Sequence, residues 1–243
     1  MLLDLKELAN LLAQDPIVTY KLRHQIFHSP WGKDGRLWHD RDAVMLLDYG
    51  LHMYGREEVL DKFLSQLETG REYHIFGVST GLLPLLEQHF DSIQREENCT
   101  AYTMSPEDFQ GGERLPSLSI DDAEFVDEHW TYKHEGSAEF FKEIIRSYPS
   151  SVIRIDGQLA GWSVCYDATD DMVNLGSLRV LDQYKRRGLG HKLAVDLVQK
   201  VLELGKTPMV HIVDNNIASK TLSLGIGFKP HSEKIFWGKG KKK

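Results

Sequence analysis

A basic turn punctuated by two glycines is the part of the sequence best suited to bind an anion. It runs Lys-Arg-Arg-Gly-Leu-Gly over residues 185–190, after an extended segment, Val173–Leu181, and before a strongly helical stretch, His191–Leu204. A helix that begins there presents unpaired N–H groups and the positive end of its dipole, and glycine lets an anion approach the backbone closely. The turn therefore predicts a phosphate site, most plausibly for a diphosphate.

The spacing of the glycines indicates the kind of phosphate site. Neither the GxxxxGK[ST] pattern of a P-loop nor the GxGxxG pattern of a dinucleotide fold occurs here. The turn resembles the R/Q-x-x-G-x-G/A signature of the GNAT superfamily of acyl-CoA-dependent N-acyltransferases, with Gly188 and Gly190 as its glycines and Lys185 in place of Arg or Gln. Downstream, Asn216–Ser219 and Leu224–Phe228 resemble the superfamily's Asn-bearing turn, short helix and closing Gly-Phe.

The resemblance covers Leu118–Trp237 and is closest to the glycine N-acyltransferase-like branch of the superfamily. The segments that carry this finer likeness are His129–Tyr132, Arg146–Pro149, Gly161–Ser163 and Val213–Asn216. It implies an α/β fold with a central mixed, mostly antiparallel sheet flanked by helices. It also implies transfer of an acetyl or longer acyl group from acyl-CoA to a primary amine, a small amine or an amino acid such as glycine.

The elements expected around the turn agree with that fold. Amphipathic helices are predicted over Ile120–Trp130 and Ser137–Ser147, and the stretch His191–Leu204 is the long helix after the turn. Asp156-Gly157 between apolar runs predicts a β-hairpin. The strands expected in this half are Ser151–Ile155, Leu159–Tyr166, Met172–Leu181, Met209–Val213 and Lys229–Trp237, with a short helix at Ser219–Leu224.

The resemblance places acyl-CoA against the strand that precedes the turn and against the turn itself. In the superfamily, that strand pairs its backbone with the pantetheine arm, and the neighbouring strand diverges to leave a notch for the thioester. The residues thereby expected to bind the co-substrate are Leu178, Arg179, Val180, Lys185, Arg186, Arg187, Gly188, Leu189, Gly190, His191, Asn216 and Ser219.

The catalytic residues expected by resemblance differ from the common pattern. Ser223 stands where many members have a Tyr, and a serine hydroxyl is a much weaker acid than a phenol of pKa about 10. The strand before the turn has no Glu to act as base, and Asn174 is among its polar residues. His211 on the next strand is the best remaining base, because its reference pKa of about 6.5 suits proton transfer near neutral pH. The alternative is a hydrogen-bonded structural histidine.

The N-terminal half has no phosphate turn. Ser105-Pro106, Gly111-Gly112 and Pro116 cluster between the halves, which predicts an α/β region at residues 1–110 and an acyltransferase domain at residues 117–243. The first region is interpreted as a degenerate GNAT-like unit, although no internal sequence repeat is detectable. Helices are predicted at Leu2–Ala13, Glu57–Leu67 and Gly81–Phe90, and strands at Val44–Leu47 and His74–Val78.

The amino-acid composition limits the binding partners and the cellular compartment that we expect for the protein. The net charge of −7 argues against general nucleic-acid or anionic-membrane binding, and no apolar run is long enough to span a membrane. Cys99 and Cys165 are too few for a disulfide framework and suit a reducing compartment. Because Met1–Glu7 does not resemble a signal or transit peptide, we expect a cytoplasmic protein, with the mitochondrion as the alternative that the family suggests. Lys239–Lys243 is expected to be a frayed, solvated end.

Two other functions remain open at this point. One is acetylation of a protein N-terminus or lysine, and the other is a non-catalytic acyl-CoA-binding protein, which the missing Tyr and Glu favour. Cys165 is interpreted as a buried thiol rather than an acylated nucleophile, because no His or Asp lies near it in the sequence to activate it. The histidine spacings match no zinc pattern, so no metal is expected.

Overall fold

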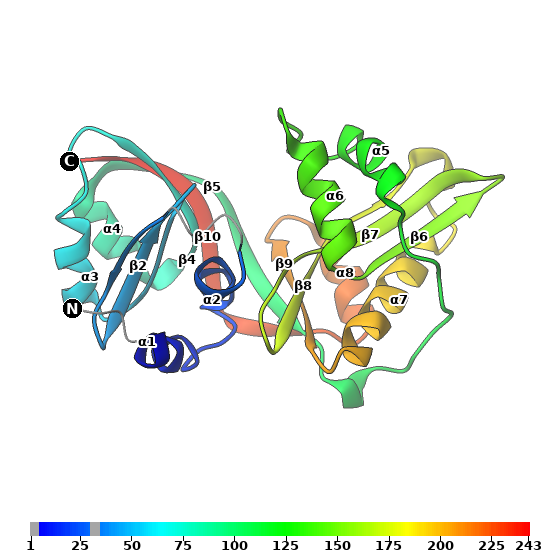
Figure 1. Ribbon diagram of the computed structural model, residues 1–243, viewed down its shortest axis with the longest axis horizontal. Coiled ribbons are helices and arrows are strands. Elements are labelled where there is room, and N and C mark those ends of the chain that lie inside the picture. Colours follow the sequence, from blue (N-terminus) through cyan, green and yellow to red (C-terminus); the bar gives the residue numbers. More distant parts are fainter. Residues whose placement is uncertain (1–4, 30–34) are drawn as a thin grey trace. The chain divides into compact units, whose positions relative to one another are not determined.

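The computed structural model describes residues 5–29 and 35–243, which form two compact units (Figure 1). The first contains the described residues up to Ala101 together with Ile212–Asn215 and His231–Lys243. The second contains Tyr102–His211 and Asn216–Pro230. No helix among the described residues is both long and apolar enough to cross a membrane.

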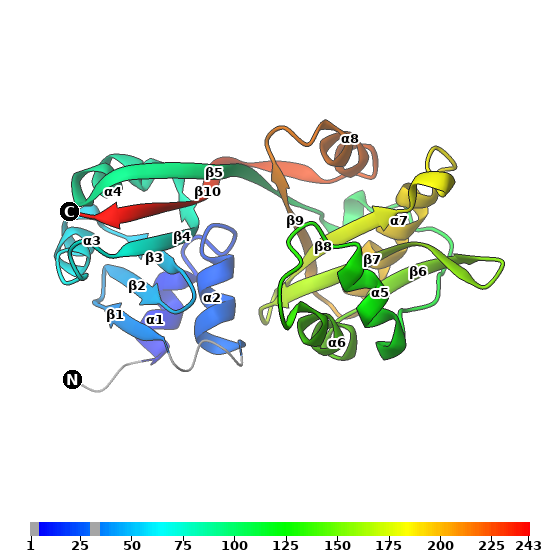
Figure 2. The ribbon, with the colours of Figure 1, turned by 90° about the horizontal axis from the view of Figure 1, so that it is seen from above.

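The first unit is an α/β unit built on strands that come from both ends of the chain. Strands β1, β2 and β3 pair antiparallel, β3 runs parallel to β4, and β4 pairs antiparallel with the C-terminal strand β10 (Figure 2). Its elements are α1 (Leu5–Leu12), α2 (Tyr20–Phe27), β1 (Arg36–His39), β2 (Ala43–Leu47), β3 (Leu51–Gly55), α3 (Glu57–Leu64), β4 (Glu72–Ser79), α4 (Leu83–His89), β5 (Phe90–Thr103) and β10 (Lys229–Lys242).

The second unit carries the glycine turn. Strands β6, β7 and β8 form an antiparallel meander, and β9 runs parallel to β8. Alternate residues of β7 face opposite layers: Trp162 lies in the core formed with α5 and α6, whereas Gly161 lies against Leu193 of α7. The elements are α5 (Ala123–Glu128), α6 (Ser137–Ser147), β6 (Ser150–Ile155), β7 (Gln158–Ala168), β8 (Met172–Val180), α7 (Leu189–Glu203), β9 (Thr207–Val213) and α8 (Ile217–Gly225).

The two halves of the chain repeat one order of elements. Each has two helices, three antiparallel strands, a helix, a strand parallel to the third, a further helix and a last strand. Thus α1 to β5 corresponds, element by element, to α5 to β10. The repeat escapes detection in the sequence because the corresponding elements differ in length and in the residues at their ends.

Most elements predicted near the turn are present within a few residues of the expected bounds. Helix α6 matches its prediction, and the hairpin turn has both Asp156 and Gly157 at positive φ, 51° and 76°. The predicted first helix of the domain divides into a 3₁₀ turn, Ile120–Asp122, and α5. The first helix of the chain is described from Leu5 onward, so the beginning of its predicted range lies outside the described residues.

The boundary between the two compact units differs from the predicted division into continuous domains at residues 1–110 and 117–243. The proline- and glycine-rich segment does lie between elements, but the compact units divide at Ala101/Tyr102, and His231–Lys243 packs with the first unit. This return follows from the pairing of β10 with β4, which runs from Ile235↔Ser79 to Lys241↔Glu72.

The expectation of a frayed lysine-rich end is wrong. The Lys242 N–H donates to the Arg71 carbonyl at 2.9 Å, and the Lys242 carbonyl accepts the Gly70 N–H at 2.8 Å. Glycine permits the close packing of this segment, because a Cβ at Gly238 would lie 2.5 Å from the Gln94 carbonyl oxygen. Backbone pairing therefore outweighs the weak strand preference of Gly and Lys.

We predict that deleting Lys239–Lys243 destabilises the protein by at least about 2 kcal/mol, since it removes several backbone hydrogen bonds that are each worth about 1 kcal/mol. Urea unfolding would measure the change. The matched control is the double substitution Lys239→Ser and Lys241→Ser, which keeps the backbone and should cost less than about 1 kcal/mol. Equal unfolding midpoints for the deletion and the full chain would contradict the structural role of this segment.

Candidate active site

Strands β8 and β9 pair over only part of their length. Their parallel register runs from Met172↔Thr207 to Asn174↔Met209, and beyond Asn174 the described residues of the two strands no longer pair with each other. The following residues of β8 continue to pair with β7, through Arg179↔Trp162 and Val180↔Gly161. One edge of β8 therefore turns away from β9 and leaves its backbone groups available to a ligand.

A β-bulge marks the point of divergence. Trp162 pairs with Arg179 and Val164 with Gly176, so Ser177 and Leu178 both lie opposite the single residue Ser163. Ser177 has φ of 37°, in the left-handed region that few side chains other than glycine adopt readily. Such a bulge twists the strand and redirects its backbone groups. Leu178, next to it, is 38% exposed.

The glycine turn lies at the end of this strand and leads into α7. Arg186 and Gly188 have positive φ, 61° and 73°, and Gly188 is the N-cap of the helix. The Lys192 N–H donates to the Gly188 carbonyl at 3.2 Å. The N–H groups of Leu189, Gly190 and His191 precede this first turn and have no carbonyl of the helix to bind. This is the backbone geometry of an anion site.

The two glycines serve different purposes. Gly188 needs its left-handed backbone, although a Cβ there would meet nothing within 4 Å. Gly190 has no positive φ, and a Cβ there would make ordinary contacts with Leu178 and Val180, at 3.7 and 3.9 Å. Packing within the protein therefore does not require glycine at position 190, which agrees with a role in leaving room for a ligand.

The basic side chains of the turn are exposed and only partly matched by acids. Lys185 lies 2.6 Å from Asp182, and this hydrogen bond and charge hold the pKa of the Asp182 carboxyl below its usual value. Arg187 donates to the Gln183 carbonyl at 3.2 Å and lies over the Tyr184 ring. Lys185 is thus less available to an anion in this structure than the sequence suggests.

A buried ionic network positions α7 and hence its N-terminus. Asp196 of α7 is fully buried and accepts hydrogen bonds from the Ser151 hydroxyl and the Leu115 N–H, the latter at 3.0 Å. Lys200 lies 2.7 Å from the same carboxylate and also donates to the carbonyls of Leu115 and Ser150, at 2.9 and 2.7 Å. The charges compensate each other, so the helix is fixed against β6 and the segment before it.

The predicted catalytic residues lie on three elements. Asn174 is buried on β8 at the last residue pair that joins β8 to β9. His211 is half-buried on β9, two residues after Met209, where the strands have separated. Ser223 is buried on α8, and its carbonyl accepts the Phe228 N–H at 3.0 Å. The structure thus associates Asn174 and His211 with the divergence.

The predicted ligand residues at the start of α8 have a visible structural role. The Asn216 side chain caps the helix by accepting the Ser219 N–H at 3.0 Å. This hydrogen bond replaces one that the helix itself cannot supply.

Two structural features near β8 were not predicted from the sequence. Arg179 donates to the His129 carbonyl at 2.8 Å, which ties the strand to the end of α5. The His129 ring also contacts Trp162, with ring centroids 5.8 Å apart. The aromatic residues were visible in the sequence, but only the fold brings them together. The left-handed residue Ser177 had no sequence signal, because glycine is the usual indicator of positive φ.

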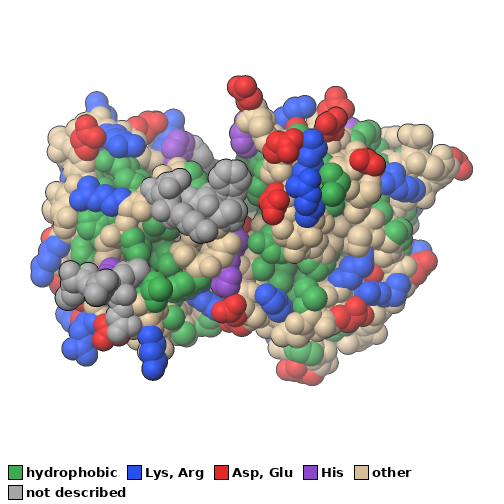
Figure 3. Space-filling view, in the orientation of Figure 1, with side chains coloured by type: hydrophobic (Ala, Val, Ile, Leu, Met, Phe, Trp, Pro, Cys, Tyr) green, Lys and Arg blue, Asp and Glu red, His purple; other side chains and the backbone are tan. Residues whose placement is uncertain are grey.

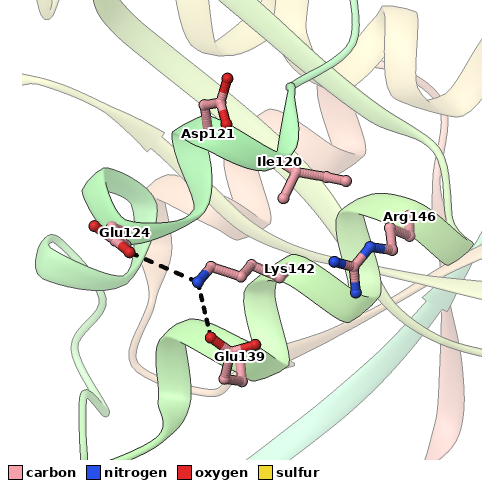
Figure 4. A pocket seen from close by; sticks show the side chains of 6 residues that line it. All are labelled: Ile120, Asp121, Glu124, Glu139, Lys142 and Arg146. Carbon is pink, nitrogen blue, oxygen red and sulfur yellow. Dashed lines mark hydrogen bonds and ion pairs between the residues drawn. The ribbon is translucent and has the colours of Figure 1, made fainter.

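The rest of the second unit has no equally organised site among its described residues. Acidic and basic side chains are interspersed on the face in Figure 3. A hollow of about 420 Å³ lies between α5 and α6, where Lys142 pairs with Glu124 at 3.6 Å and with Glu139 at 2.8 Å (Figure 4). Among the described residues, no group of His, Cys, Asp or Glu side chains is arranged to hold a metal ion.

Known proteins of solved structure share the fold of this chain. The FR47-like protein family model matches residues 154–237. A Drosophila protein of solved structure is 22% identical, with a TM-score of 0.65, covering 97% of this chain and 86% of its own. A GCN5-related N-acetyltransferase from Kribbella flavida is 13% identical, with a TM-score of 0.63 and coverages of 91% and 93%.

A GNAT-family acetyltransferase from Colwellia psychrerythraea is also 13% identical, with a TM-score of 0.60 and coverages of 93% and 97%. The chain has the GNAT acetyltransferase fold. This confirms the predicted fold class, an α/β structure with a mixed central sheet flanked by helices. Among proteins of curated function, none matches the chain in sequence.

We predict that neither cysteine reacts under native conditions. Cys99 and Cys165 are both fully buried, and burial raises the pKa of the Cys165 thiol far above its ordinary value, so little thiolate forms near neutral pH. Titration with Ellman's reagent should detect almost no thiol in the folded protein and both thiols in denaturant. Rapid labelling of Cys165 in the folded protein would reopen its role as a nucleophile.

Proposed function

We propose that the protein transfers an acyl group from acyl-CoA to a primary amine. The observation that carries the proposal is the combination of two features on one strand, the exposed edge of β8 where β9 diverges and the helix N-terminus that follows its end. The first suits an extended amide-bearing arm and the second a diphosphate. The fold and the match to the FR47-like family support the same reading.

In this proposal, acyl-CoA is bound chiefly by backbone groups. The diphosphate lies against the N–H groups of Leu189, Gly190 and His191, and Arg186 and Arg187 add positive charge. The pantetheine arm pairs along Leu178, Arg179 and Val180. Gly188 and Lys185 shape the turn and contribute charge, and Asn216 and Ser219 border the site from the start of α8.

The reaction is direct attack of the amine nitrogen on the thioester carbon. The C–N bond forms, the carbonyl oxygen takes negative charge, and the C–S bond then breaks to release the CoA thiolate. A backbone N–H of the bulged strand is suited to stabilise the oxyanion. The amine must lose a proton, and His211 is the proposed base. Asn174 is proposed to orient polar groups in the notch, and Ser223 to donate to the leaving sulfur.

We propose a small amine or an amino acid such as glycine as the acceptor, on the likeness of Gly161–Ser163 and Val213–Asn216 to the glycine N-acyltransferase-like branch. Acetylation of a protein N-terminus or of lysine is the alternative within the fold. A non-catalytic acyl-CoA-binding protein is the alternative outside enzymes. Release of free thiol from acetyl-CoA in the presence of mixed amines would distinguish an enzyme from a binding protein.

The first unit is proposed to be a degenerate copy of the same fold. It repeats the order of elements, but only Arg56 separates β3 from α3, the counterparts of β8 and α7. The first turn of α3 carries Glu57 and Glu58. Carboxylates at a helix N-terminus occupy the place of an anionic ligand and repel it, so acyl-CoA is assigned to the second unit alone.

We predict that Gly190→Glu weakens CoA binding more than about 100-fold, because the new carboxylate meets the phosphates at the helix N-terminus. Lys185→Ala or Arg186→Ala should weaken it less than about tenfold, since exposed charges are screened by salt. Calorimetric titration with CoA would measure all three. Gly225→Glu is the matched control, at an exposed glycine with nothing within 4 Å. Unchanged affinity in a folded Gly190→Glu protein would refute the site.

We predict that His211→Ala lowers kcat at least about tenfold and leaves acyl-CoA affinity nearly unchanged, as expected on losing a general base. Steady-state rates between pH 6 and 9, with CoA titrations of both proteins, would test this. If kcat of the variant equals that of the parent throughout this range, His211 is a structural residue and the proton leaves by another route.

A further inference from the structure

The first unit contains a cavity of its own. Its volume is about 500 Å³, and it lies where β3 and β4 end and where α3 and α4 begin, with α1 beside it. Leu11, Val18, Met53 and Leu82 supply its apolar lining. Tyr54, Ser79 and Glu233 supply polar groups.

The repeat of elements explains why a cavity lies here. Strands β3 and β4 correspond to β8 and β9, and their parallel pairing is at Leu51↔Ile75. Met53 and Tyr54, farther along β3, line the cavity together with Ser79 at the end of β4. The first unit therefore keeps an opening between these two strands, without the turn that would bind a diphosphate.

One carboxylate in this cavity is not balanced by a positive side chain. Glu233 is half-buried and accepts a hydrogen bond from the Ser79 hydroxyl, which is itself buried. No Lys, Arg or His of the described residues pairs with it, whereas Arg56, also in the lining, is matched by Asp42 and Glu58 at 3.5 Å each. A carboxylate in such a place is favoured by a cation that enters the cavity.

The pKa of the Tyr54 hydroxyl is also affected by the negative charges around the cavity. Burial, followed by the charges of Asp15 and Glu233, raises the pKa of its hydroxyl above 10.0. The phenol therefore stays neutral and is able to accept a hydrogen bond from an ammonium group. Arg41 also lines the cavity but is exposed to solvent, so its repulsion of a cation is weakened by water and salt.

We propose that this cavity binds a primary ammonium compound with a compact apolar body, its ammonium group at Glu233 and Tyr54 and its carbon chain against Leu11, Val18, Met53 and Leu82. The volume lies within the range of pockets that hold small organic molecules. By contrast, the hollow of Figure 4 has its lysine already paired with two glutamates, and its lining is mainly charged.

The test is calorimetric titration of the full chain, without any CoA compound, with three probes of similar shape. These are 3-methylbutylamine, leucine and 4-methylpentanoate, which carry an ammonium group, both charges, and a carboxylate alone. The amine should bind and the carboxylate should not. A comparison of the affinities of leucine and 3-methylbutylamine shows whether Arg41 also binds a carboxylate on a molecule that carries the ammonium group. Binding of the carboxylate alone, or of none of the probes, overturns the proposal.

Variants locate the binding. Glu233→Gln keeps the size of the side chain and should weaken binding of 3-methylbutylamine at least about tenfold. Glu87→Gln, an exposed carboxylate on α4 in the same unit, is the matched control and should leave it unchanged. Equal affinity in both variants, with thermal unfolding unchanged, places the amine elsewhere and overturns the proposal. Because no acyl-CoA is present, neither result bears on the acyltransferase proposal.

Discussion

The packing of the second unit depends on the buried ion pair of Asp196 and Lys200. Asp196 is fully buried, and its carboxylate is balanced by Lys200, one helical turn later on α7. The exposed Arg114 also lies 3.7 Å from Asp196 but compensates it only partly, so removing Lys200 would leave a poorly compensated buried carboxylate, which costs several kcal/mol. The pair also binds the backbone of Leu115 and Ser150, so it holds the segment that precedes α5 within this unit against the edge strand β6. Helix α7, whose N-terminus is the proposed anion site, is thereby held at its buried face.

Strand separation, rather than a particular set of side chains, is what the two units share. Each has a parallel pair of strands that is short, and in each the loss of pairing leaves polar backbone beside apolar side chains. What differs is the start of the next helix: Gly188-Leu-Gly190 in one unit and Glu57-Glu58 in the other. The opposite charge at these two helix N-termini is the reason why we propose different ligands for the two units.

The helices and strands that were predicted correctly are those with a strong local pattern in the sequence. Helix α6 and the Asp156-Gly157 hairpin follow from periodicity and turn chemistry. Strand β5 was missed because Ser92–Asn98 is largely polar, and only its place beside β10 makes it a strand. The bulge at Ser177 is equally invisible, since it arises from pairing with β7, and the local ion pair of Lys185 with Asp182 was not anticipated although the two residues are only three positions apart. The glycines of the turn were found because two glycines among basic residues, directly before a helical stretch, form a local sequence pattern.

The place of β10 has a consequence for how the chain is made. The first unit includes His231–Lys243, which follow the second unit in the sequence, and β10 pairs with β4. A ribosome synthesises a chain from its N-terminus, and domains generally fold in that order. Here one edge of β4 stays unpaired until the second unit and β10 have been synthesised. An exposed strand edge is able to pair with other chains, so we expect slow elongation to prolong the time during which this edge is open to aggregation.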